Sequence, residues 1–155
     1  TMKNNPLFLL IPFFIYSSCA KEKGCTQQDP SLEKTAIVDF CTSNTITYTQ
    51  DPSGIFYQII TPGTGTQPTT SSRVFMYYTG KYLNGTIFDQ LSDPTRSGWT
   101  LSSLIEGWKI GIPLIKKGGR IKLIIPSALA YGCTGYASIP PNTPLYFDVT
   151  LTDVQ

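Results

Sequence analysis

The sequence predicts an α+β domain in which an antiparallel β-sheet is combined with one short α-helix and preceded by a helical extension. Three observations lead to this fold class. Two long segments, 73–83 and 145–154, have the period-two pattern of strands. Asn84-Gly85 is a preferred sequence for a hairpin turn. Only one short stretch between the predicted strands suits a helix.

The first 18 residues are typical of a secretory leader. Met2-Lys3 is a short basic start, and residues 7–16 form an apolar run. As a helix this run would be about 15 Å long, about half the thickness of a bilayer core. It ends in Tyr16-Ser17-Ser18-Cys19, similar to the lipobox of bacterial lipoproteins. We therefore expect residues 1–18 to be a lipoprotein signal peptide and Cys19 to be the lipidation site; the alternative is a cleaved secretory signal in which Cys19 is incidental.

Residues 19–53 are predicted to form a tether and a helical extension. Asp29-Pro30 supplies an N-cap followed by a proline at the first helical position. The helix can pack against the main domain or serve in dimerisation. Its apolar residues recur at helical spacing: Leu32, Ala36, Ile37, Phe40 and Cys41.

Residues 54–155 contain the predicted sheet. The helix expected near 106–115 includes Gly111 and Pro113, both poor helix formers, so packing must hold it. The segment 126–144 is long for a connection in a compact domain, and we interpret it as a working loop. The predicted strands are Ile55–Ile60, Arg73–Leu83, Thr86–Asp89 after the hairpin turn, Arg120–Ile125 and Leu145–Val154.

Composition excludes several functions. The chain has no histidine, which argues against most hydrolytic proton shuttles and zinc sites. Its 12 Lys and Arg and 10 Asp and Glu are scattered, so we expect no nucleic-acid partner. The four cysteines form no CxxC pair, and we expect no metal and no cofactor. If Cys19 carries lipid, Cys25 and Cys41 are the nearest remaining pair, and a disulfide between them is one possibility in an oxidising compartment. Cys133 would then remain a free thiol.

Aromatic and apolar residues recur from Phe88 to Phe147 beside one isolated carboxylate, Asp89. This combination predicts a dry pocket with aromatic walls. Considered alone, Phe147 or Tyr78 would be assigned to core packing, so the prediction depends on their joint arrangement.

Seven short motifs follow one another along the predicted domain: Tyr78-Thr79-Gly80, Asn84-Gly85 with Phe88-Asp89, Leu104-Ile105-x-Gly107-Trp108, Lys117-Gly118-Gly119, Ile125-Pro126, Ala130-Tyr131-Gly132 and Ile139-Pro140-Pro141-Asn142. Together they closely resemble the FK506-binding-protein (FKBP) type of peptidyl-prolyl cis-trans isomerase, and the resemblance covers roughly residues 54–155. It implies a bent antiparallel sheet wrapped around one short helix, with the active pocket between them. The leader and the extension before Gly54 are similar to those of family lipoproteins from Bacteroidetes-like bacteria.

The resemblance also implies a role for each site residue. Asp89, Tyr131, Trp108 and Phe88 would be catalytic: Trp108 as the pocket floor, Phe88 as a wall, Tyr131 as a hydroxyl donor and Asp89 as the polar element. The substrate-binding residues would be Tyr78, Trp99, Leu104, Ile105 through its N–H, Ile139 and Phe147. The chain departs from the family at three positions. Trp99 stands where the family usually has Phe, Ser97 occupies a position that is often apolar, and Glu106 replaces the common Pro or Arg. The departures at Ser97 and Glu106 bear on substrate preference.

The expected function is isomerisation of X-Pro bonds in extracytoplasmic proteins. Rotation about such a bond faces a barrier of about 18–20 kcal/mol and needs neither a nucleophile nor a proton carrier. The implied partners are proline-containing polypeptides, FK506-like macrolides and a membrane reached through the lipid anchor, with the protein in the cell envelope, attached to the outer membrane. The alternative is a lipoprotein that holds proline segments without catalysis, as a chaperone or adhesin.

Overall fold

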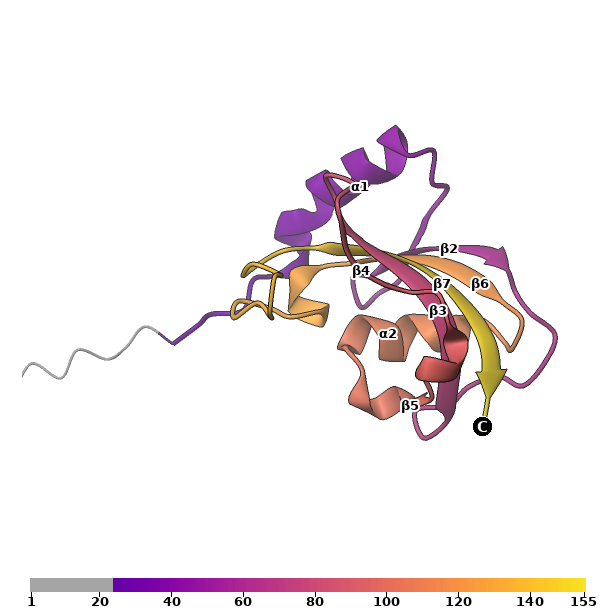
Figure 1. Ribbon diagram of the computed structural model, residues 1–155. Helices are drawn as coiled ribbons and strands as arrows, with labels where there is room; N and C mark the ends of the chain where they lie inside the picture. Colours follow the sequence, from indigo (N-terminus) through magenta and orange to yellow (C-terminus); the bar gives the residue numbers. More distant parts are fainter. Residues whose placement is uncertain (1–23) are drawn as a thin grey trace, which may run out of the picture.

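The computed structural model describes residues 24–155, which form a curved antiparallel sheet with a helix on each face (Figure 1). The strand order is β1-β2-β6-β7-β3-β4, and β5 pairs with β3. The strands are β1 (Thr49–Gln50), β2 (Phe56–Thr61), β3 (Arg73–Tyr82), β4 (Ile87–Leu91), β5 (Trp99–Thr100), β6 (Arg120–Ile125) and β7 (Leu145–Val154). The helices are α1 (Lys34–Ser43) and α2 (Glu106–Gly111), with 3-10 turns η1 (Pro30–Glu33), η2 (Pro94–Arg96), η3 (Leu101–Ser103), η4 (Ile112–Leu114) and η5 (Ser127–Leu129).

The predicted fold class is confirmed, and the long strands lie where the sequence placed them. The chain reverses at Asn84-Gly85, where the Tyr82 N–H donates to the Thr86 carbonyl at 2.9 Å. Only the two-residue strands β1 and β5 were missed, because two residues are too few to establish a period.

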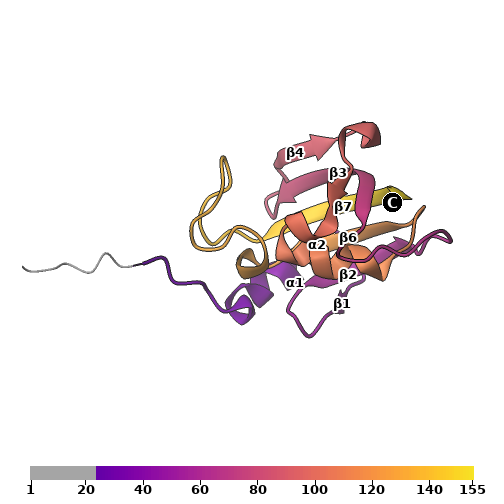
Figure 2. The same cartoon turned by 90° about the horizontal axis from the view of Figure 1, so that it is seen from below.

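The two faces of the sheet build two separate hydrophobic clusters. On β7, Phe147 belongs to the cluster that packs against α2, whereas the adjacent Tyr146 belongs to the cluster under α1. Successive side chains of a strand point to opposite faces, so the alternation read from the sequence decides which residues meet each helix. Figure 2 shows α2 lying across the strands on its face of the sheet.

Two glycines explain why α2 forms despite a sequence that is poor in helix formers. A Cβ at Gly107 would overlap the side chain of Ile125, and one at Gly111 would overlap that of Leu123 on the same strand, β6. The glycines are one helical turn apart and allow the helix backbone to approach the sheet closely. Tertiary packing therefore overrides the low helix propensity, and the helix continues from Gly111 into η4, which contains Pro113.

The helical extension begins as predicted. The Asp29 carboxylate accepts a hydrogen bond from the Ser31 N–H at 2.8 Å, and α1 buries Ile37, Phe40 and Cys41 against the sheet. The expectation that this helix packs on the main domain is confirmed. The predicted apolar stripe was too wide, however, because Leu32 is 72% exposed and Ala36 is also exposed.

The possible disulfide between Cys25 and Cys41 is wrong, as is the expectation that Cys133 is a free thiol. Cys25 is bonded to Cys133, with Cα atoms 5.6 Å apart, and Cys41 is a buried free thiol. The reason is the path of the tether, which runs beside the 126–144 loop, while Cys41 faces the sheet from the buried side of α1.

The predicted leader and Cys19 lie outside the described residues. Within residues 24–155, no helix has both the length and the hydropathy needed to cross a membrane.

Candidate active site

The predicted aromatic residues surround a small cavity between α2 and the sheet. Its volume is about 110 Å³. Pockets for drug-sized ligands measure roughly 300–1,000 Å³, so this cavity suits one ring rather than a whole organic ligand. Five parts of the chain supply the lining, which consists of Tyr78 (β3), Phe88 and Asp89 (β4), Leu104, Ile105 and Trp108 (the start of α2), Tyr131 (the 126–144 loop) and Phe147 (β7).

The rings around the cavity pack edge to face. The centroid of the Trp108 ring lies 5.1 Å from those of Tyr78 and Phe147, with interplanar angles of 82° and 80°. Phe88 meets Phe147 at 5.6 Å and 87°. Perpendicular contacts are favourable for aromatic pairs. The cavity is therefore lined by rings that pack against one another.

Gly80 on β3 permits this arrangement. A Cβ there would lie 2.8 Å from a ring carbon of Phe88 and 2.9 Å from one of Phe147. Both distances are too short for real side chains, so the two walls meet over this backbone position only because it carries no side chain. Gly80 belongs to one of the sequence motifs but was not predicted to have a role; the signal that could have identified it is its position two residues after Tyr78, on the same face of the strand.

Asp89 is the only carboxylate in the lining, and Tyr78 orients it. The Tyr78 hydroxyl donates a hydrogen bond to Asp89 Oδ2 at 2.5 Å. Burial raises the pKa of Tyr78 above its ordinary value, and the hydrogen bond and charge of Asp89 raise it further. Tyr78 therefore stays protonated and keeps donating at physiological pH.

Two groups at the cavity have donors that no other residue among 24–155 uses. No described residue accepts a hydrogen bond from the Ile105 N–H, which precedes the first turn of α2, or from the Tyr131 hydroxyl. Burial raises the pKa of Tyr131, with a smaller contribution from the charge of Asp89, so this phenol also stays protonated. Both groups are free to donate to a ligand carbonyl.

The Trp108 indole adds a third donor without a partner. Its Nε1 is buried, and no described residue accepts a hydrogen bond from it. An unpaired buried donor costs about 1–3 kcal/mol, so it is a feature that a stable core alone would not favour.

The 126–144 loop is held at its tip by β3. Tyr82 Oη donates to the Ser138 carbonyl at 2.7 Å, and the backbones of Tyr136 and Ile139 pair with each other. The rings of Tyr131 and Tyr136 stack with centroids 5.1 Å apart and an interplanar angle of 13°. The loop predicted to be functional is therefore ordered, and it presents two aromatic side chains beside the cavity.

Two predicted substrate-binding residues do not line the cavity. Trp99 packs behind Tyr78, with ring centroids 6.4 Å apart, and Ile139 is buried in the core cluster. The family departures are also peripheral. Ser97 Oγ accepts a hydrogen bond from the Met76 N–H at 2.9 Å, at an irregular step of β3, and Glu106 pairs with Lys109 on the exposed side of α2.

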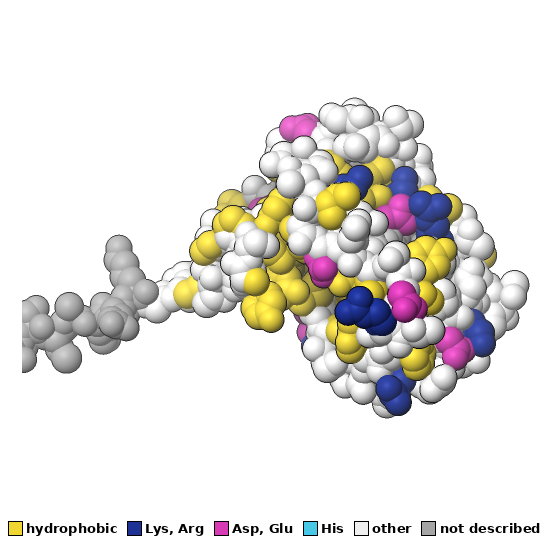
Figure 3. Space-filling model, viewed as in Figure 1, with side chains coloured by type: hydrophobic (Ala, Val, Ile, Leu, Met, Phe, Trp, Pro, Cys, Tyr) yellow, Lys and Arg dark blue, Asp and Glu magenta, His cyan; other side chains and the backbone are white. Residues whose placement is uncertain are grey.

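Hydrophobic side chains gather on the surface where this loop lies beside α2 (Figure 3). Tyr136 is 65% exposed there, and most charged side chains in this view lie elsewhere. An apolar border around a small aromatic cavity suits an extended polypeptide with a ring that enters the cavity.

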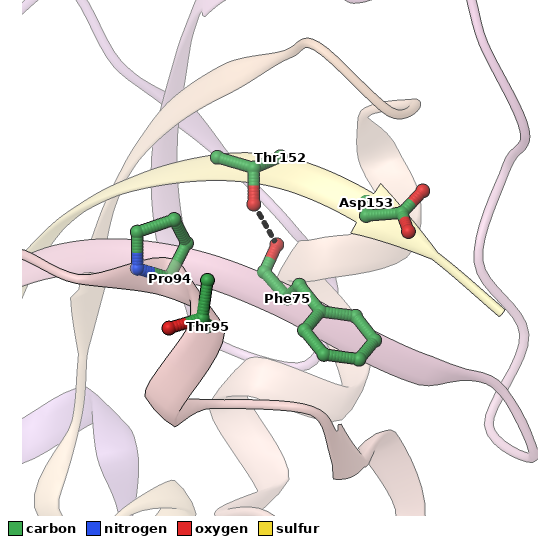
Figure 4. Close-up of a pocket in the computed structure, with 5 residues that line it drawn as sticks. All are labelled: Phe75, Pro94, Thr95, Thr152 and Asp153. Atoms are coloured by element: carbon green, nitrogen blue, oxygen red, sulfur yellow. Dashed lines mark hydrogen bonds between the residues drawn. The ribbon is translucent and has the colours of Figure 1, made fainter.

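A larger hollow lies on the outer side of β3. Its volume is about 340 Å³, and it is lined by Phe75, Pro94, Thr95, Thr152 and Asp153 (Figure 4). Its polar groups are already paired: Thr152 Oγ1 donates to the Phe75 carbonyl at 3.0 Å, and Asp153 binds Lys117 at 2.6 Å. Volume alone therefore does not identify the site. The smaller cavity is the candidate because it combines aromatic walls with an oriented carboxylate and donors that no described residue uses. Among residues 24–155, no cluster of three or more His, Cys, Asp or Glu could hold a metal ion.

Comparisons with known proteins agree with this geometry. The family described as FKBP-type peptidyl-prolyl cis-trans isomerase matches residues 64–152. The Escherichia coli protein FkpA, named as an FKBP-type peptidyl-prolyl cis-trans isomerase, is 43% identical over 106 residues, which cover 66% of this chain and 38% of that protein. A probable FKBP-type isomerase of Haemophilus influenzae is 35% identical over 145 residues, 91% of this chain and 58% of the relative. The chain thus spans less than two thirds of the length of each of these relatives.

Solved structures give the same result. The crystal structure of FkpA from Escherichia coli superposes with a TM-score of 0.71 at 36% identity, covering 82% of this chain and 61% of that one. A peptidyl-prolyl cis-trans isomerase from Pseudomonas syringae superposes with a TM-score of 0.69 at 32% identity, covering 84% of this chain and 98% of that one.

Proposed function

Because the chain belongs to the FKBP-type peptidyl-prolyl cis-trans isomerase family, we propose that it accelerates rotation about X-Pro bonds in polypeptides. The observation that carries this proposal is the ring-sized cavity, walled by Trp108, Phe147 and Phe88, beside donors that have no acceptor among the described residues. The proline ring would enter the cavity, and the flanking chain would lie along the apolar border.

The cavity would act mainly by removing water. A planar amide has more charge separation than a twisted one, so transfer into apolar surroundings destabilises the ground state more than the transition state. Reaching about a hundred to a thousand turnovers per second from the uncatalysed rate requires roughly 7 kcal/mol. Shape, desolvation and one or two hydrogen bonds are of the right size to supply it.

The polar groups would hold the substrate in register. The Ile105 N–H and the Tyr131 hydroxyl would each donate to a carbonyl that flanks the proline. Asp89, fixed by Tyr78, would place a negative charge near the rotating amide. No residue needs to change its protonation state, which agrees with a lining that contains no histidine.

FK506-like macrolides would bind at the same place, with one ring in the cavity. Since the cavity measures only about 110 Å³, most of such a ligand would lie outside it, against exposed side chains such as Tyr136. This explains how one site could serve both an inhibitor and a peptide.

The proposal extends to the organisation of the chain and to its location. Residues 1–18 would be a signal peptide, Cys19 would be lipidated, residues 19–53 would connect the anchor to the isomerase domain of residues 54–155, and the protein would act in the cell envelope at the outer membrane. The Cys25–Cys133 disulfide supports an oxidising compartment, because structural disulfides are rare in the cytosol of most organisms.

The direct test is the isomerisation rate of a short Ala-Leu-Pro-Phe peptide with catalytic amounts of the protein. A rate proportional to protein concentration and suppressed by FK506 is the expected result. If the peptide or FK506 quenches tryptophan fluorescence while the isomerisation rate stays at its uncatalysed value, the protein binds proline segments without catalysis and the proposal is wrong.

A further inference from the structure

The segment before the isomerase domain contacts the loop that carries Tyr131. Glu33 is 92% shielded from solvent by the fold (8% exposed), and both carboxylate oxygens bind Ser127: Oε2 accepts from the Ser127 N–H at 2.7 Å, and Oε1 accepts from its hydroxyl. These residues are 94 positions apart in sequence. The matched family segment begins at residue 64, so Glu33 lies outside it.

Ser127 in turn fixes the backbone around Tyr131. Its carbonyl accepts hydrogen bonds from the N–H groups of Ala130, at 3.0 Å, and Gly132, at 2.8 Å. The residues on both sides of Tyr131 are therefore tied to one carbonyl. One side chain that binds both the N–H and the hydroxyl of Ser127 restricts this turn further, because it fixes the backbone and the side chain of the same residue.

Gln27 holds the loop from the other side. Its Nε2 donates to the Ala128 carbonyl at 2.9 Å, and its Oε1 accepts from the Cys133 N–H at 3.0 Å. Its amide lies so close to Gly132 that a Cβ there would overlap it. Cys25, two residues before Gln27, is bonded covalently to Cys133.

From these contacts we infer that Glu33 and Gln27 are positioning residues for the Tyr131 hydroxyl, so the segment before the family domain completes the active site. The inference rests on the proposed function for its catalytic consequence only. The geometric part, that the two side chains order the turn around Tyr131, does not depend on any activity.

The kinetic test uses Glu33→Ala and Gln27→Ala in the parent and in Tyr131→Phe. If both act through the hydroxyl, each should lower kcat/KM about five- to tenfold in the parent and less than about twofold in Tyr131→Phe, because coupled residues are not additive. Glu33→Gln should restore kcat/KM, since its amide can accept from the Ser127 N–H and donate to Ser127 Oγ. Asp39→Ala, which removes an exposed carboxylate from α1, is the matched control and should change nothing.

Amide hydrogen exchange separates this inference from the proposed function. Glu33→Ala should speed exchange at Ala130 and Gly132, and Gln27→Ala should speed it at Cys133, whether or not the parent isomerises peptides. Unchanged exchange, or equal losses of kcat/KM with and without the Tyr131 hydroxyl, would overturn the inference. If Glu33→Ala fails to fold, Gln27→Ala decides, because Gln27 is exposed and its removal leaves the core intact.

Discussion

The two faces of the sheet each carry a small hollow bordered by aromatic rings, and the hollows have nearly the same volume. The one between α2 and the sheet measures about 110 Å³ and the one beside α1 about 120 Å³. The first is lined by five aromatic rings, four of which pack edge to face, together with an oriented carboxylate, Asp89. The second combines two rings with Lys81, Lys122 and Asn44, whose polar ends favour water. Two hollows of nearly equal volume thus differ in their linings, and we expect a site only on the α2 face, because the proposed mechanism needs apolar walls that exclude water.

The largest expected effect comes from removing a ring on each face. Trp108→Ala opens the cavity floor to water and should lower kcat/KM about 100-fold, or roughly 2.7 kcal/mol, in a protein that still folds. Phe40→Ala on α1 should reduce the free energy of unfolding by about 3–5 kcal/mol and leave kcat/KM of the folded protein unchanged. Peptide isomerisation and denaturant unfolding of both variants provide the check. Equal losses of activity would remove the distinction between the faces.

A smaller effect is expected from the aspartates. Asp89→Val removes the carboxylate that Tyr78 holds and should lower kcat/KM about 30-fold. Its counterpart on the outer face, Asp148, forms a two-bond pair with Arg120 at 2.8 Å. Because that pair is exposed to solvent, Asp148→Asn should cost no more than about 1 kcal/mol of stability and no activity. A strong loss of activity in Asp148→Asn would show that the outer face also contributes to catalysis.

Gly80 offers a finer test of wall geometry. Gly80→Ala forces the rings of Phe88 and Phe147 apart or into the cavity, and we expect kcat/KM to fall about tenfold, mainly through a higher KM. Thr79→Ala changes the neighbouring residue, whose side chain points to the outer face, and serves as the control. If kcat and KM of Gly80→Ala equal those of the parent, the Phe88 and Phe147 rings can move apart without reducing activity.

The smallest effect concerns pH. Since the chain has no histidine and the pKa of Tyr131 is raised, kcat/KM should change by less than about twofold between pH 6 and 9. Burial also raises the pKa of Tyr78 and Tyr146, one on each face, with smaller contributions from Asp89 and Asp148. Groups with raised pKa stabilise the fold below their unfolded pKa, about 10 for tyrosine, and this stability is lost as the pH rises through the folded pKa.

Unfolding measurements from pH 9 to 11 should therefore show decreasing stability, and both Tyr78→Phe and Tyr146→Phe should weaken that decrease. Only Tyr78→Phe should alter kcat/KM. Stability that rises in this range would contradict the assigned direction of the pKa shifts.

The sequence was sufficient where local pattern decides the structure. The alternation of Phe147 with Tyr146 placed each on the correct face, and the motif around Trp108 placed the indole beside the cavity. The position of Trp99 behind Tyr78 was beyond such reasoning, since a motif match gives a residue's place in the chain but not how its side chain packs.

Contacts between distant segments were the part that the sequence could not provide. The partner of Cys25 is 108 residues away, and the partner of Glu33 is 94 residues away. Nearness in sequence favoured Cys41 instead, because nothing local indicates that the tether runs beside the 126–144 loop. Similarly, the helix propensity of Gly111 says nothing about the Leu123 side chain that requires a glycine there.

The central place of β7 has a consequence for biosynthesis. This strand pairs with β3 on one side and β6 on the other, and it supplies Phe147 to the cavity. Until the ribosome has released residues 145–154, the two halves of the sheet have no strand to join them, and such distant pairings form slowly. A nascent chain that still lacks β7 therefore has no complete cavity, and we expect it to acquire the proposed activity only after this strand has paired on both sides.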